Sequence, residues 1–196
     1  MKSLITTLLL VITLSSTVFG DDFSDGYSAY KKGDYKTAMR LWKPLAEQGH
    51  ANAQTNLGLM YDNGDGVPED DKQAVKWYRL AVKKGLAAAQ YNLGVMYFNG
   101  QGVPEDDKQA AKWFRLAAEQ GYADAQSNLG GMYALGRGVP ENNVLAYMWW
   151  NLAAANGIEN ASTGKDIITK RMTSSQIAEA QKLSRECLRK NYKNCY

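Results

Sequence analysis

The sequence predicts an all-α protein in which hairpins of two helices repeat every 36 residues and stack as an α/α solenoid. The segment Ala-Gln-Thr-Asn-Leu-Gly at residues 53–58 recurs, with one substitution each time, at 89–94 and at 125–130. Other residues follow the same offset: Val67, Val103, Val139, Trp77, Trp113, Trp149, Gly85, Gly121 and Gly157. Because one amphipathic hairpin cannot bury its apolar face alone, we expect successive copies to share a continuous core.

Each repeat is predicted to contain two helices, which we call helix A and helix B. Helix A carries apolar residues at helical spacing, which in the middle repeat are Ala89, Leu93, Met96 and Tyr97. The Gly-Gln-Gly-Val-Pro segment at 100–104 ends it. Asp106 is a predicted N-cap of helix B, which ends at Gly121. Its apolar face is made of Ala110, Trp113, Phe114 and Ala117.

Three glycines of the repeated motif, Gly58, Gly94 and Gly130, fall in the middle of helix A. Glycine costs about 1 kcal/mol relative to alanine inside a helix. We therefore expect tight packing at these positions, with the close approach of a neighbouring backbone offsetting the loss.

The ends of the chain depart from the repeat. Residues 21–49 are predicted to form an N-terminal hairpin like those of tetratricopeptide repeats, with a kink at Pro44. Residues 158–196 form a degenerate repeat and a capping helix, which opens with a capping box from Thr173 to Gln176. Between these ends lie three full repeats, at about 50–85, 86–121 and 122–157.

Residues 1–20 have the composition of a secretory signal peptide. Lys2 is followed by an apolar run at 4–14 and by small residues up to Gly20, after which we place cleavage. The alternative, an uncleaved membrane helix, needs about twenty mostly apolar residues, and polar residues interrupt this run from Thr13 onward. The sequence thus predicts a periplasmic or secreted protein that is not stably inserted in a membrane.

The net charge narrows the class of possible partners. The formal net charge of +3 falls to +2 without Lys2, so no strong positive field favours the binding of nucleic acid.

Cys187 and Cys195 are the two cysteines, and after export we expect them to form a disulfide that stabilises the tail by about 2 to 3 kcal/mol. A redox-active pair is the weaker alternative, because the Cys-x-x-Cys spacing is missing.

Together these motifs resemble the Sel1-like repeat family, a branch of the tetratricopeptide superfamily. The resemblance rests on Ala-x-x-x-Leu-Gly-x-x-Tyr, Gly-x-Gly-Val and Ala-x-x-Trp, and it is strongest over residues 50–157. It implies a right-handed α/α superhelix. Family members serve mainly as adaptors for protein complexes, and exported bacterial members are linked to envelope signalling and host interaction. The resemblance therefore implies a protein or peptide partner.

Positions of helix A that differ between repeats are free of the demands of stacking, and they mark a candidate binding stripe. In superhelices of this type the A helices line the concave surface, so a bound peptide would contact this stripe. Its candidate residues are Thr55, Leu59, Asp62, Tyr91, Val95, Phe98, Ser127 and Ala134. The alternative is ordinary core between repeats, in which Tyr91 or Phe98 fills the gap left by Gly131.

Catalytic motifs are weak in this sequence. Some exported family members are described as binding or hydrolysing β-lactams, and two Ser-x-x-Lys matches begin at Ser28 and Ser162. Neither Ser-Asp-Asn nor Lys-Thr-Gly accompanies them. His50 is the single histidine, which excludes a cluster of histidine ligands. We predict a monomeric, non-catalytic adaptor without metal or cofactor, with a hydrolase or binder of β-lactams or cell-wall fragments as the alternative.

Overall fold

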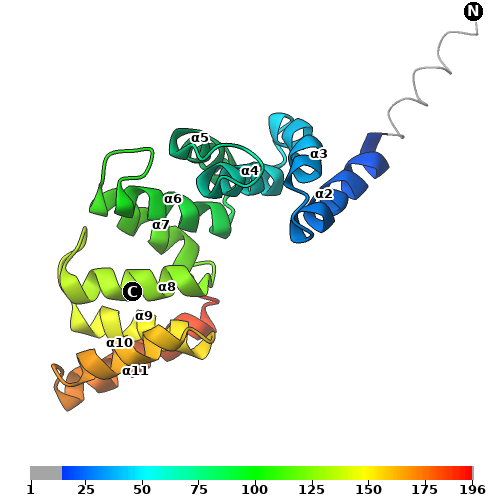
Figure 1. Cartoon of the computed structure of the whole chain (residues 1–196). Coiled ribbons are helices and arrows are strands. Elements are labelled where there is room, and N and C mark those ends of the chain that lie inside the picture. The colour runs from blue at the N-terminus through cyan, green and yellow to red at the C-terminus, as the bar shows by residue number, and fades with distance from the viewer. Residues whose placement is uncertain (1–14, 196) are drawn as a thin grey trace, which may run out of the picture. The chain divides into compact units, whose positions relative to one another are not determined.

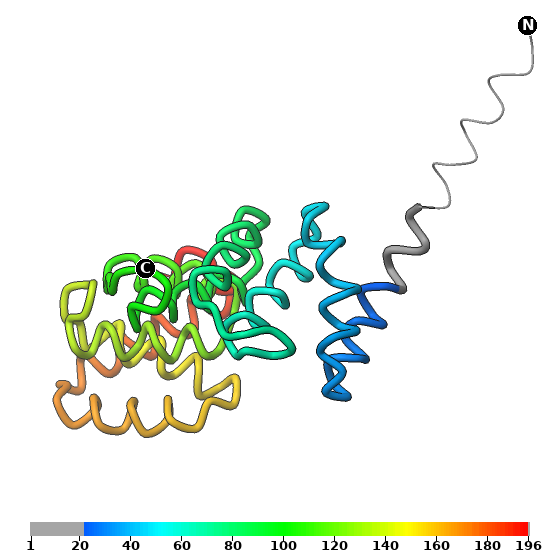
Figure 2. Tube along the Cα trace, turned by 45° about the horizontal axis from the view of Figure 1, so that its top comes forward, coloured from blue at the N-terminus to red at the C-terminus, as the bar shows by residue number. Residues whose placement is uncertain are grey.

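The computed structural model describes residues 15–195, with side chains from residue 22 onward, and every regular element in this range is a helix (Figure 1). These residues divide into two compact units, and the boundary along the chain falls between Lys84 and Gly85. The first unit contains α2 (Ser15–Lys31), α3 (Tyr35–Glu47), α4 (Ala51–Asn63), α5 (Asp71–Ala81) and the 3-10 turn η1 (Val82–Lys84). Within it α2 pairs with α3, and α4 pairs with α5 and also packs on α3 (Figure 2).

The second unit contains the remaining helices: α6 (Ala87–Asn99), α7 (Asp107–Ala118), α8 (Ala123–Leu135), α9 (Asn143–Ala155), α10 (Glu159–Thr169) and α11 (Ser174–Arg189). Each helix from α6 to α9 packs on the next one along the chain, and α9 is also in contact with both α10 and α11. These hairpins confirm the predicted all-α repeat architecture.

Local sequence sets the ends of these helices. Asp106 accepts a hydrogen bond from the backbone N–H of Gln109 at 3.0 Å, as predicted, and Asp70 and Asn142 cap the other B helices in the same way. Gly100 ends α6 at φ +69°, a left-handed conformation that glycine adopts without strain. The capping box of Thr173 is present at the start of α11. Pro44 lies inside α3.

The glycines in the middle of the A helices are explained by aromatic side chains, which corrects our expectation of a neighbouring backbone. A Cβ atom on any of these glycines would lie 2.4–2.8 Å from a ring atom of the paired B helix. The three pairs are Gly58 with Tyr78, Gly94 with Phe114, and Gly130 with Trp150. The aromatic ring of helix B therefore packs directly on the backbone of helix A.

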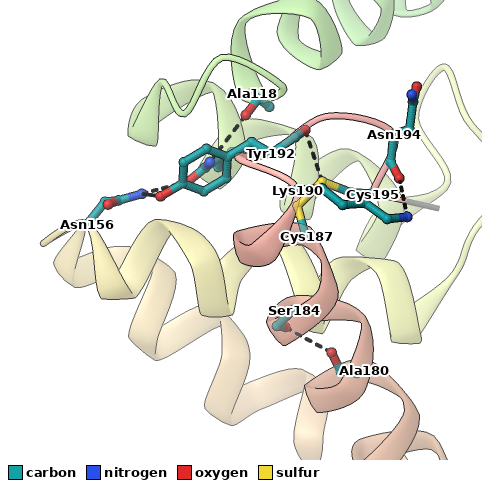
Figure 3. Close-up of a disulfide and its surroundings, with 10 residues drawn as sticks. Ala118, Asn156, Ala180, Ser184, Cys187, Lys190, Tyr192, Asn194 and Cys195 are labelled. Carbon is teal, nitrogen blue, oxygen red and sulfur yellow. Dashed lines mark hydrogen bonds between the residues drawn. A yellow bond between two sulfur atoms is a disulfide. The ribbon is translucent and has the colours of Figure 1, made fainter.

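The Cys187–Cys195 disulfide is present and ties the tail to α11 (Figure 3). Both cysteines are buried. The loop that they close holds Tyr192 at φ +64° with its ring against Gly121, where an added Cβ would lie 2.9 Å from the ring. Asn156 donates a hydrogen bond to the Tyr192 hydroxyl at 3.4 Å. The tail thus packs on the turn between α7 and α8 and on the end of α9.

The predicted signal peptide, residues 1–20, lies mostly outside the described residues and remains a prediction. Among the helices of the described part, none is long and apolar enough to cross a membrane. The disulfide is consistent with an oxidising compartment outside the cytoplasm.

Candidate peptide-binding pocket

The eight residues of the predicted binding stripe differ in exposure. Thr55, Ser127 and Ala134 are buried, whereas the other five are partly exposed. The hydroxyl of Thr55 donates to the carbonyl oxygen of Ala51 at 2.9 Å, inside its own helix. The stripe is therefore a mixture of core positions and accessible positions.

In the first unit, Leu59 and Asp62 lie at the surface of α4. Leu59 lines a small pocket of about 70 Å³ together with aromatic residues of the N-terminal hairpin. The carboxylate of Asp62 accepts a hydrogen bond from the hydroxyl of Tyr78 at 3.2 Å. Burial raises the pKa of Asp62, and the nearby charges of Asp71 and Glu69 add to the rise, while the bond from Tyr78 opposes it.

In the second unit, Tyr91 packs mainly on other aromatic rings. Its ring stacks on that of Tyr122 with centroids 5.0 Å apart and lies 5.8 Å from that of Phe114. Burial is the main reason that the pKa of Tyr91 is raised, with contributions from Asp124 and Tyr122. Tyr91 therefore belongs more to the packing between repeats than to an open surface.

Phe98 and Ser127, by contrast, come together at a pocket of about 280 Å³, which we call the α8 pocket. Residues of three helices, α6, α8 and α9, line it with side chains from the loop after α8 and from α10. The lining residues are Phe98, Ser127, Asn128, Gly131, Leu135, Arg137, Trp150 and Asn160. Two of the eight predicted stripe residues thus contribute to one cavity.

Trp150 forms one wall of the α8 pocket and is fixed from two sides. Its ring is held between the backbones of Gly130 on α8 and Gly164 on α10, where added Cβ atoms would lie 2.8 Å and 2.7 Å from the ring. The indole N–H donates to the carbonyl oxygen of Ser127 at 3.0 Å. A side chain held in this way is a rigid apolar surface for a ligand.

Arg137 and Phe98 form the opposite rim. The guanidinium lies 4.2 Å from the centroid of the Phe98 ring and bonds both oxygens of Asp107, at 2.8 and 3.0 Å. It also bonds Glu105 at 3.0 Å. The hydrogen bonds with Asp107 are the main reason that the pKa of Arg137 is raised. With two carboxylates around one guanidinium, the rim offers little free positive charge.

Apolar and amide groups complete the site. Leu135 is 71% exposed at the end of α8, the largest exposure among the exposed large apolar side chains of the described residues. Asn128 and Asn160 add side-chain amides, and the Oδ1 of Asn160 accepts from the hydroxyl of Ser127 at 3.3 Å. Amide groups of this kind can pair with the backbone of a bound peptide.

Trp150 was not among the site residues predicted from the sequence. The signal was available, because Tyr78, Phe114 and Trp150 follow the 36-residue offset and only the last is a tryptophan. The 36-residue offset gave no comparable reason to place Asn160 or Arg137 in the site. Their proximity to Phe98 depends on how the hairpins stack.

The glutamines that repeat at the same position of each helix A have an internal role. The side-chain amide of Gln54 donates to the carbonyl oxygen of Ala46 at 2.9 Å, and that of Gln126 donates to Ala118 at 3.2 Å. Each bond satisfies a carbonyl at the end of the preceding B helix. These glutamines are buried and belong to the scaffold.

The residues considered for catalysis are spread apart. Ser28 and Ser162 are both exposed, on α2 and α10. His50 caps α4, its Nδ1 accepting from the backbone N–H of Ala53 at 3.2 Å. Within residues 15–195, no group of three His, Cys, Asp or Glu side chains could hold a metal ion.

Helical hairpins with this glycine–aromatic packing define a repeat protein of the tetratricopeptide-like class. The model of the Sel1 repeat matches residues 23–50, 51–86, 87–122 and 123–158. The chain therefore belongs to the Sel1 repeat family, whose members generally act as scaffolds for protein interaction. The first match covers most of the segment that we expected to form an N-terminal hairpin.

Solved structures show the same architecture. A Sel1 repeat protein from Oxalobacter formigenes is 34% identical with a TM-score of 0.72, over 75% of this chain and 59% of that one. A protective antigen present in uropathogenic Escherichia coli strains, which displays an SLR fold, is 30% identical with a TM-score of 0.62, over 87% of this chain and 45% of its own.

Two curated relatives share a shorter region. Exopolysaccharide production negative regulators of Rhizobium leguminosarum bv. viciae and Rhizobium meliloti are 41% and 43% identical over 51 and 49 residues, about a quarter of this chain. The matched region spans less than a fifth of each regulator, 19% and 18%.

Proposed function

We propose that this chain is an exported, non-catalytic adaptor that holds a protein or peptide partner at the α8 pocket. The observation that carries the proposal is the exposed Leu135 beside a cavity walled by Phe98 and Trp150. Exposed apolar side chains around an aromatic pocket are typical of surfaces that anchor a partner's side chain.

The size of the pocket suits an anchor side chain of a larger partner. Pockets for drug-sized molecules typically measure about 300–1,000 Å³ and enclose most of the ligand. The α8 pocket, at about 280 Å³, is suited to one or two side chains of a larger partner. Asn128 and Asn160 at its edge would pair with the backbone on either side of that anchor.

The destination is the periplasm or the exterior of the cell. The N-terminal residues have the pattern of a signal peptide, and the Cys187–Cys195 disulfide suits an oxidising compartment. The rhizobial relatives match this chain over 51 and 49 residues, which supports a common interaction module rather than a common regulatory activity.

Leu135→Asp tests the proposal, because a charge at the rim opposes an apolar anchor without disturbing a buried side chain. We expect the variant to capture its partner from the envelope fraction of the producing cells at least about tenfold less well than the parent. Ile167→Asp is the matched control, since Ile167 is a similar apolar residue on α10 that is 51% exposed. Equal capture by Leu135→Asp and the parent would contradict the proposal.

A further inference from the structure

A second surface lies along one stripe of α7 and shares no lining residue with the α8 pocket. Lys108, Lys112 and Leu116 follow one another at spacings of four, so they share one face of the helix. All three are exposed, Leu116 by 37%. They line a cleft of about 250 Å³ between α7 and the loop residues Gly138 and Val139. Ala111 and Leu116 therefore add apolar surface beside the two lysines.

Asp107, the acidic residue next to Lys108 in the chain, is already paired. Asp107, in the first turn of α7, bonds Arg137. Arg115 adds a further positive charge at the cleft while its guanidinium donates to the hydroxyl of Tyr133 at 2.7 Å. Glu119 lies one turn beyond Leu116 and interacts with Arg115, but the charged side chains that line the cleft itself are Lys108, Lys112 and Arg115, all basic.

The same stripe occurs in the first unit. On α5 the corresponding residues are Lys72, Lys76 and Leu80, each 36 positions earlier. Both lysines are exposed, and Leu80 is partly exposed. Since exposed lysines are not needed to pack a hairpin, the stacking of the repeats does not account for their recurrence. Each compact unit therefore carries one helix with this Lys-x-x-x-Lys-x-x-x-Leu stripe, and the cleft beside it is found on α7.

The last repeat shows what this face can hold. Its equivalents on α9 are Val144, Met148 and Leu152, and the last two are fully buried. α10 packs on α9 as α8 packs on α7, and α11 is the additional helix in contact with α9 (Figure 1). The side of α11 that is buried there consists of small residues, Ala180, Ser184 and Cys187. A helix of the same chain therefore docks on the apolar version of this face.

We infer that the basic stripes of α5 and α7 dock an acidic amphipathic helix of a partner protein. The precedent of α11 on α9 indicates a helix as the occupant, and the lysines indicate its charge. Asp or Glu residues three or four positions apart would face Lys108 and Lys112, and an apolar residue one turn further along would contact Leu116. This surface is separate from the α8 pocket, so an adaptor with both could hold two partners at once.

The test uses the full chain and a synthetic, fluorescently labelled helical peptide with Glu at positions i and i+4 and Leu on the same face. Fluorescence anisotropy should show binding that weakens as salt is raised. Reversal of all four lysines, Lys72→Glu, Lys76→Glu, Lys108→Glu and Lys112→Glu, should weaken binding about tenfold, because each rim pair contributes modestly. Replacing the same four lysines with alanine should give a smaller loss.

A control variant with the same change in net charge shows whether a loss of binding comes from this surface or from the overall charge of the protein. It reverses Lys170, Arg171, Lys182 and Arg185, which lie on or before α11, and we expect unchanged binding. Three results would overturn the inference: equal loss in the control, equal binding of a peptide with Lys in place of Glu, or equal binding of a proline-interrupted acidic peptide that cannot form a helix. The last would indicate a surface for any polyanion. Circular dichroism verifies that each variant is folded.

Discussion

Trp150→Ala is expected to lower the free energy of unfolding by about 3–5 kcal/mol, the usual cost of truncating a well-packed large aromatic residue. The ring fills the space between α8 and α10 and donates a hydrogen bond to Ser127. Its removal leaves a cavity that the flanking backbones of Gly130 and Gly164 can close only by moving. Denaturant unfolding followed by circular dichroism measures the loss.

A double-mutant cycle with Gly130→Ala tests whether glycine and ring are matched. Alone, Gly130→Ala should destabilise by about 1–3 kcal/mol, because the new methyl group overlaps the indole. In the Trp150→Ala background the same substitution should no longer destabilise the protein. It should instead raise the free energy of unfolding by up to about 1 kcal/mol, because alanine favours the helix more than glycine does. Gly131→Ala is the control, since the nearest atom to its Cβ is 4.0 Å away. We expect it to stabilise, and equal effects at Gly130 and Gly131 would contradict the account.

The double variant Cys187→Ser with Cys195→Ser is expected to lose about 2–3 kcal/mol of stability under oxidising conditions. The open chain gains entropy when unfolded, and in the folded state Tyr192 is no longer held on Gly121 and Asn156. A thiol reductant should lower the melting temperature of the parent protein and leave that of the double variant unchanged. Equal melting temperatures of parent and variant without reductant would contradict a stabilising role.

Much of the fold could be predicted because it depends on local signals. Asp106, Gly100 and the capping box of Thr173 mark helix ends through contacts within a few residues along the chain. The 36-residue offset then places the hairpins in order. The disulfide was predictable because Cys187 and Cys195 leave a single intramolecular pairing.

The candidate site was less predictable because it depends on distances between hairpins. A position that differs between repeats can be exposed, as Phe98 is in part, or buried, as Ser127 and Ala134 are. Which case holds depends on how the neighbouring helices pack. Gly130 indicated that a neighbouring group packs closely on helix A. Only the folded chain shows that this group is the ring of Trp150 and that the same ring lines the α8 pocket.

The most direct test of the central claim, that the α8 pocket binds a partner, is photo-crosslinking in the producing cells. Benzoylphenylalanine replaces Phe98, and in a second strain it replaces Ser175, an exposed residue on α11. We predict that mass spectrometry identifies one protein joined to position 98, absent from position 175 and lost when Leu135→Asp is added. No adduct at position 98, or the same adduct at both positions, would contradict the claim.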